Sequence, residues 1–151
     1  MFQRPLALLA LSAFLSCASA NAQEPQTQLP RVTLTAGMYQ IDAQVAQTPQ
    51  QHQIGLMFRK EMPQAEGMIF VFDRPGTQCF WMRNTLLPLT AAFVADDGRI
   101  VNLADMKPMT EDSHCSEEPV RFVLEMNQGW FARKNIKKGA KLGGELFANK
   151  R

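Results

Sequence analysis

The sequence has no excess of charge of either sign and few of the side chains that metal sites use. Sixteen lysine and arginine residues stand against fourteen aspartate and glutamate residues, the formal net charge is +2, and the basic residues are scattered. A nucleic-acid-binding protein needs a basic stripe that neutralises several phosphates, so we expect no nucleic-acid partner. The two histidines and three cysteines lack the paired spacing of a zinc site.

Serine is scarce beyond the N-terminal region. Residues 23–151 contain two serines, Ser113 and Ser116, and both flank His114. Because neighbouring side chains point in different directions, a serine–histidine–acid arrangement would have to recruit the distant His52. We therefore do not expect a serine hydrolase.

The chain also lacks an apolar run long enough to cross a membrane. Residues 6–16 form an apolar run of eleven residues after Arg4, whereas a helix needs about 20 residues to cross a hydrocarbon core of about 30 Å. Ala20–Ala22 then provides a small-x-small cleavage signal. We expect residues 1–22 to be a signal peptide and the mature protein to be periplasmic or secreted, with no transmembrane helix. Lipid attachment at Cys17 is an alternative.

Length and composition predict a single globular domain after this segment. Of the 151 residues, 46% are hydrophobic and 20% are charged. Residues 23–30, QEPQTQLP, are polar and contain proline, so we expect a flexible linker before one β domain over residues 31–151. In an oxidising compartment, Cys79 and Cys115 are expected to form a disulfide that stabilises the fold by about 3–4 kcal/mol. Two separate buried thiols are the alternative.

Alternating apolar residues predict mostly strands. Asp96-Asp97-Gly98 predicts a tight hairpin turn, and two short helices are expected, one that begins at Thr48-Pro49 and one that is capped by Asn127. The absence of strand–helix–strand alternation predicts a mainly β fold, a compact antiparallel sandwich or distorted barrel with two short helices. Strands are expected within residues 32–45, 68–72, 79–82, 89–95, 99–103 and 120–126, and at the C-terminal end.

Three motifs carry a resemblance to a known family. They are GLMFRKEMPQAEGMIFVF (Gly55 to Phe72), FWMRNTLLPL (Phe80 to Leu89) and PVRFVLEMNQGWF (Pro119 to Phe131). Through them the chain closely resembles the domain of unknown function 192 family, from about Val32 to Leu146. The resemblance implies a mostly β domain that is often exported in bacteria, and it transfers no activity. Relatives usually have aspartate where this chain has Thr90, which puts a carboxylate mechanism at that position in doubt.

Polar and aromatic side chains are densest at residues 81–84. On a strand, Trp81 and Arg83 would share one face, which we expect to be open to solvent. An indole beside a guanidinium and the amide of Asn84 offers stacking and directed hydrogen bonds, and Trp130 is a candidate second wall. Our leading hypothesis is a monomeric, non-enzymatic domain without a cofactor that binds a small polar ligand or an envelope partner through this face.

Two alternatives use sulfur and imidazole chemistry. Met106, Met109 and His114, with Cys115 as a further ligand, combine the soft donors that suit Cu(I), which predicts a periplasmic copper-handling protein. Methionine is also an adaptable filler of protein cores, so these residues have a plain structural interpretation as well. A third hypothesis is a cysteine-dependent hydrolase that uses Cys79 and His114 and requires Cys79 to be a free thiol.

Overall fold

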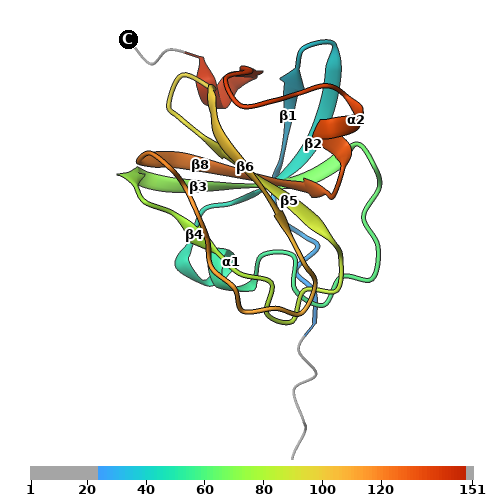
Figure 1. Ribbon diagram of the computed structural model, residues 1–151. Coiled ribbons are helices and arrows are strands. Elements are labelled where there is room, and N and C mark those ends of the chain that lie inside the picture. The colour runs from blue at the N-terminus through green and yellow to red at the C-terminus, as the bar shows by residue number, and fades with distance from the viewer. Residues whose placement is uncertain (1–23, 149–151) are drawn as a thin grey trace, which may run out of the picture.

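The computed structural model describes residues 24–148 of the chain (Figure 1). The predicted signal peptide and the alternative lipid-attachment residue Cys17 lie outside these residues. Across residues 24–148, no helix is both long enough and apolar enough to cross a membrane.

Seven strands form one curved sheet in the order β6-β5-β8-β3-β2-β1-β9 (Figure 1). Neighbouring strands are antiparallel except β2 and β3, which are parallel. The expected mainly β fold with two short helices is therefore confirmed. The seven strands are β1 (Arg31–Ala36), β2 (Tyr39–Ala46), β3 (Glu66–Gly76), β5 (Leu89–Val94), β6 (Ile100–Met106), β8 (Val120–Asn127) and β9 (Leu142–Gly143).

The parallel connection from β2 to β3 contains the first helix, α1 (Pro49–Ile54). Its start matches the prediction, because the Thr48 hydroxyl accepts from the Gln51 backbone N–H and the Gln51 side chain accepts from the Thr48 N–H. Gly55 ends the helix with a φ of +49°, and a Cβ there would lie 3.3 Å from the Phe70 ring. The turn therefore needs glycine for both its backbone angle and its packing.

Both faces of the sheet are covered by apolar side chains. The α2-side cluster lies under the second helix, α2 (Trp130–Arg133), and the C-terminal segment, and the α1-side cluster lies under α1 and the loops on either side of β3. Strand β8 contributes to both clusters, since its residues alternate between the two faces. The largest fully buried members of the α2-side cluster are Leu34, Ile41, Ile69, Ile100, Phe122 and Phe131. Those of the α1-side cluster are Leu56, Met68, Phe70, Met82, Leu89 and Phe93.

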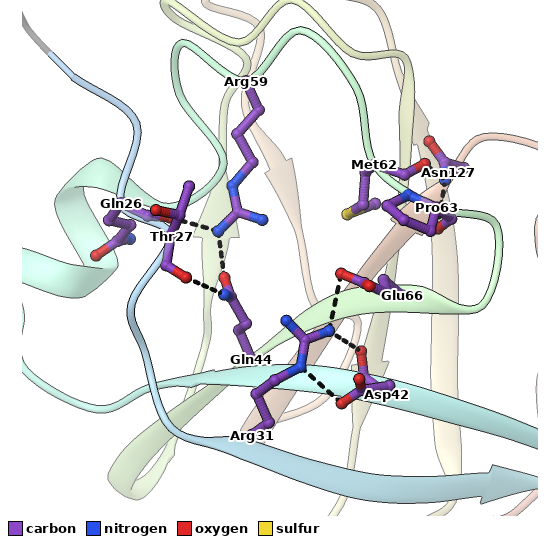
Figure 2. Close-up of polar contacts among 10 residues, drawn as sticks. All are labelled: Gln26, Thr27, Arg31, Asp42, Gln44, Arg59, Met62, Pro63, Glu66 and Asn127. Carbon is purple, nitrogen blue, oxygen red and sulfur yellow. Dashed lines mark hydrogen bonds and ion pairs between the residues drawn. The ribbon is translucent and has the colours of Figure 1, made fainter.

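Asn127 does not cap the second helix, so this prediction is wrong. The residue is the last of β8, and α2 begins after Gly129, which has a φ of +79° and makes no side-chain cap. The Asn127 amide instead donates to the carbonyl oxygens of Met62 at 2.9 Å and Pro63 at 3.2 Å (Figure 2). It fastens the loop before β3 to the end of β8.

Two predicted strands are shorter than expected. Strand β4 is Cys79–Phe80 and pairs with β7 (His114–Cys115) in a separate two-stranded sheet. The chain leaves the strand at Trp81, because the next residue, Met82, donates its backbone N–H to Thr110 O at 3.0 Å. The C-terminal strand is reduced to β9, and a 3-10 helix, η1 (Glu145–Phe147), follows it.

Residues 24–30, predicted to be a flexible linker, instead lie against the domain; we call them the N-terminal strap. The Gln26 amide donates to the carbonyl oxygens of Gln51 at 2.8 Å and Gly55 at 2.9 Å, and Pro30 O accepts from Val45 N–H at 2.8 Å. Leu29 packs against the α1-side cluster. The polar composition of residues 24–30 gave no sign of these contacts, because hydrogen bonds rather than apolar packing hold most of the strap in place.

The disulfide between Cys79 and Cys115 joins β4 to β7. The two residues are directly opposite each other in the strand pair, with Cα atoms 4.0 Å apart. The expected bond is therefore present, and it fixes the position from which the 81–84 turn departs.

Candidate functional site

A groove lies between α1 and the turn that follows β4. Its volume is about 440 Å³, and Glu24 of the N-terminal strap borders it. The side chains that give it its chemistry are Gln50, Gln53, Met57, Trp81, Arg83 and Asn84. We call this cavity the Trp81 groove, and it brings together the three residues that the sequence analysis selected.

Trp81 and Arg83 form the accessible side of the groove. The indole is 45% exposed, and the Arg83 guanidinium carbon lies 5.6 Å from the ring centroid. Arg83 Nε is 3.7 Å from Glu111 Oε1, and both side chains are largely exposed. Because an exposed ion pair of this kind is worth about 0–1 kcal/mol, it does not prevent Arg83 from binding a ligand.

The two walls of the groove meet at a pair of residues in left-handed backbone conformations. Phe58 has a φ of +65° and Asn84 a φ of +54°, and the Phe58 N–H donates to Asn84 O at 2.9 Å. Asparagine tolerates this conformation, but a bulky residue such as phenylalanine adopts it at a cost of about 1–3 kcal/mol. Such strain clusters at binding sites, where it holds side chains in a defined arrangement.

The helical wall combines amide and apolar side chains. Gln50 and Gln53 supply hydrogen-bond donors and acceptors, and Ile54 and Met57 supply apolar surface. In the sequence, Ile54 and Met57 form a short apolar stripe on one face of the predicted helix, and such a stripe ordinarily indicates a face that packs on the core. Both are half-buried, because they line the groove.

A smaller cavity of about 40 Å³ lies next to the groove, and Glu125 borders it. Met57 and Trp81 line both spaces. Glu125 is 4% exposed and lies in the central strand β8, opposite Met68 of β3 and Ala91 of β5. A space of this size accommodates a water molecule or a similarly small polar group.

Burial raises the pKa of Glu125 to about 8. A buried carboxyl group favours its neutral form, because a charged form would lose its hydration. At neutral pH, Glu125 is therefore a protonated acid that can donate a hydrogen bond beneath the groove. Glu125 was not predicted as a site residue, although an acidic residue within the apolar run FVLEM was a usable signal.

Comparison with known proteins agrees with this architecture. The family DUF192, described as "Uncharacterized ACR", matches residues 32–144. The chain belongs to this family. No curated protein matches the DUF192 chain.

Two solved structures resemble this DUF192 domain. A provisionally assigned transcription regulator from Sinorhizobium meliloti 1021 has a TM-score of 0.72 and 35% identity, over 77% of this chain and 93% of that chain. A protein of unknown function from Novosphingobium aromaticivorans DSM 12444 has a TM-score of 0.75 and 38% identity, over 83% of this chain and 94% of the other. These likenesses support the fold and assign no activity to the groove.

Trp130 does not line the Trp81 groove, so its predicted role as a second wall is wrong. Its side chain is 3% exposed in the α2-side cluster of the DUF192 domain, with its ring centroid 5.2 Å from that of Phe131 and 6.3 Å from that of Tyr39. The second wall is α1, which the sequence analysis did not place there.

The candidate copper ligands do not form one site. Met106 is fully buried in the α1-side cluster, whereas Met109 is largely exposed, and Cys115 is bonded to Cys79. The described part of the DUF192 chain also contains no group of three or more histidine, cysteine, aspartate or glutamate side chains that could hold a metal ion. These positions correct the alternative that grouped Met106, Met109, His114 and Cys115.

The same disulfide contradicts the hypothesis of a cysteine-dependent hydrolase that uses Cys79 and His114. His114 lies opposite Phe80 in the β4–β7 pair, next to the bonded cysteines. A cysteine nucleophile must be a thiolate, and Cys79 in a disulfide has none.

Thr90 has a carboxylate partner in the neighbouring strand. Its hydroxyl donates to Asp105 Oδ1 at 2.6 Å, and the two residues are opposite each other in β5 and β6. A carboxylate therefore lies at this place in the DUF192 fold although the residue after Pro-Leu is threonine. Both side chains lie at a cavity beside α2 and do not line the Trp81 groove.

Proposed function

We propose that this DUF192 protein is an exported, non-enzymatic binding domain that holds a small polar ligand in the Trp81 groove. One observation carries the proposal: a half-exposed indole, a weakly paired guanidinium and an amide face the same cavity of about 440 Å³. Ligand sites of proteins typically measure about 300–1,000 Å³ and combine apolar walls with a few polar groups.

The side chains define the chemistry of the ligand. A flat face would stack on Trp81, and a carboxylate or another hydrogen-bond acceptor would pair with Arg83. Gln50 and Gln53 would bind further hydroxyl or amide groups. Sugars, short peptides and carboxylate-bearing metabolites meet this description.

The disulfide supports the exported location within this proposal. Disulfides persist in oxidising compartments such as the periplasm and are rare in the cytosol. The Cys79–Cys115 bond also anchors the strand that precedes Trp81. Oxidation in such a compartment would therefore fix one wall of the groove.

A ligand screen tests the proposal. The mature protein is heated with panels of sugars, dipeptides and carboxylic acids, and unfolding is followed by fluorescence. A ligand at one hundred times its Kd should stabilise the protein by about 2.7 kcal/mol. Trp81→Ala should abolish the shift, and Met38→Ala should keep it, because Met38 is 85% exposed in the β1–β2 turn away from the groove.

Two results would contradict the proposal. One is the absence of a shift with any compound of the three panels. The other is a shift that survives in Trp81→Ala at its full size.

A further inference from the structure

Another cavity lies by the N-terminal strap and is separate from the Trp81 groove. Its volume is about 340 Å³, and the charged and amide side chains that line it are Arg31, Gln44, Arg59, Lys60, Glu61 and Glu66. Figure 2 shows these residues except Lys60 and Glu61. We call it the Arg59 pocket. None of the residues that line it also lines the Trp81 groove.

Arg59 is buried and has no carboxylate partner. Its side chain is 8% exposed, and one terminal nitrogen donates to Gln26 O and Gln44 Oε1. Gln44 is itself oriented by a hydrogen bond from its amide to Thr27 O at 2.8 Å. Arg59 Nε is buried without a hydrogen-bond partner. The neutral oxygens thus orient the guanidinium, but they do not neutralise it.

Two of the nearby carboxylates, Asp42 and Glu66, pair with another cation, and the exposed Glu61, which also lines the pocket, forms no ion pair with Arg59. Arg31 Nε lies 2.8 Å from Asp42 Oδ1, and Arg31 Nη2 lies 2.8 Å from Glu66 Oε2. In Figure 2 the guanidinium groups of Arg31 and Arg59 point toward the same space, and no ion pair joins Arg59 to Glu66. Glu66 therefore serves Arg31 and leaves Arg59 without a direct counter-charge among residues 24–148.

The electrostatics agree with this geometry. Burial lowers the pKa of Arg59, Glu66 offsets part of that effect, and the charge of Arg31 adds to it. Buried charges in proteins are normally paired, because an unpaired one loses its hydration without compensation. An anion that pairs with Arg59 would offset both its loss of hydration and its repulsion by Arg31.

We propose that the Arg59 pocket binds a small carboxylate that forms the missing ion pair with Arg59. A carboxylate matches the planar donor edge of a guanidinium, and such pairs are among the stronger hydrogen-bonded contacts in proteins. Arg31, which is paired with Asp42 and Glu66, also lines the pocket, and the exposed Lys60 adds positive charge there. This site is independent of the function proposed for the Trp81 groove.

Calorimetric titration with succinate tests the proposal, with sodium chloride at equal ionic strength as the reference. Succinate should bind to the wild-type protein, and Arg59→Gln should weaken binding at least tenfold. Arg59→Lys, which keeps the charge but loses the planar fork, should lie between the two. Arg74→Gln removes an exposed arginine outside the pocket and should bind as the wild type does. Trp81→Ala should also retain succinate binding, which separates this site from the groove.

A measurement on the wild-type protein guards against misfolding of Arg59→Gln. Arginine Nε–H resonances are followed by NMR during the titration, and the Arg59 signal should shift with the calorimetric Kd. The proposal is overturned if that signal stays in place at saturation, or if succinate binds no better than chloride. Full binding by a folded Arg59→Gln variant, or binding of inorganic phosphate in preference to succinate, overturns it as well.

Discussion

Glu125→Gln should remove most of the pH dependence of stability between pH 5 and pH 8. Burial raises the pKa of the folded-state carboxyl group from the usual 4.5 to about 8. Below pH 4.5 both the folded and the unfolded chain hold the proton. Between pH 4.5 and pH 8 the unfolded chain releases it while the folded protein retains it, so the free energy of unfolding falls as the pH rises. Above pH 8 both states are ionised and the loss is complete.

The magnitude follows from the difference between the two pKa values. A difference of 8 − 4.5, or 3.5, at 1.36 kcal/mol per pKa unit, amounts to about 5 kcal/mol across this range. Glutamine has nearly the same shape and does not ionise, so the variant should be the more stable protein at pH 8. The lowered pKa values of Asp97 and Glu118 act in the opposite sense and below pH 4.5, outside this window.

Urea unfolding with the disulfide intact provides the assay. For a slope of about 2 kcal/mol per molar urea, the wild-type midpoint should fall by about 2.5 M from pH 4.5 to pH 8. The Glu125→Gln midpoint should stay nearly constant over the same range. A wild-type midpoint that does not change with pH, or an equally steep dependence in the variant, would refute the assignment of Glu125 as a buried neutral acid.

Two further predictions concern the frame that holds the site. Replacing both Cys79 and Cys115 by serine should lower the free energy of unfolding by about 4 kcal/mol, because the bond closes a loop of 36 residues. Urea unfolding measures this change, and an unchanged midpoint in the double variant would show that the bond contributes nothing. Gly67→Ala should destabilise the protein by about 1–3 kcal/mol in thermal unfolding, because the new Cβ would lie 2.5 Å from Met126 Sδ. A melting temperature equal to that of the wild type would contradict the tight packing of β3 on β8.

Local sequence signals predicted the parts of the fold that depend on neighbouring residues. Thr48 and Gln51 cap α1 through contacts within one turn, and the hairpin at Asp96-Asp97-Gly98 uses a glycine with a φ of +83°. The exposure of Trp81 was also predicted, although from a strand alternation that does not apply, since β4 ends at Phe80. The Trp81 side chain is exposed because it lies in the turn that follows β4.

The remaining site residues depend on contacts between distant parts of the chain. Arg59 is oriented by Gln44, fifteen residues away, and by Gln26 of the N-terminal strap, thirty-three residues away. Glu125 is buried at its cavity because β8 lies between β3 and β5 in the sheet. This strand order brings together segments that are far apart in the sequence. No local periodicity encodes these positions, so the sequence analysis detected neither residue as a site residue.

Buried polar residues of two kinds coexist in this DUF192 domain, and the difference between them points to function. Asn102 donates to Cys115 O at 3.1 Å and Ser116 accepts from Gln78 N–H at 3.1 Å, so contacts within the fold account for both. Arg59 and Glu125 are the buried ionisable residues of the described chain, neither forms an ion pair there, and each borders a cavity. Ionisable residues at these two positions do not stabilise the fold, because Arg59 carries a buried charge without a carboxylate partner and burial disfavours the charged form of Glu125. The ligands that we propose for the Arg59 pocket and for the Trp81 groove beside Glu125 would give these residues a role that the fold does not.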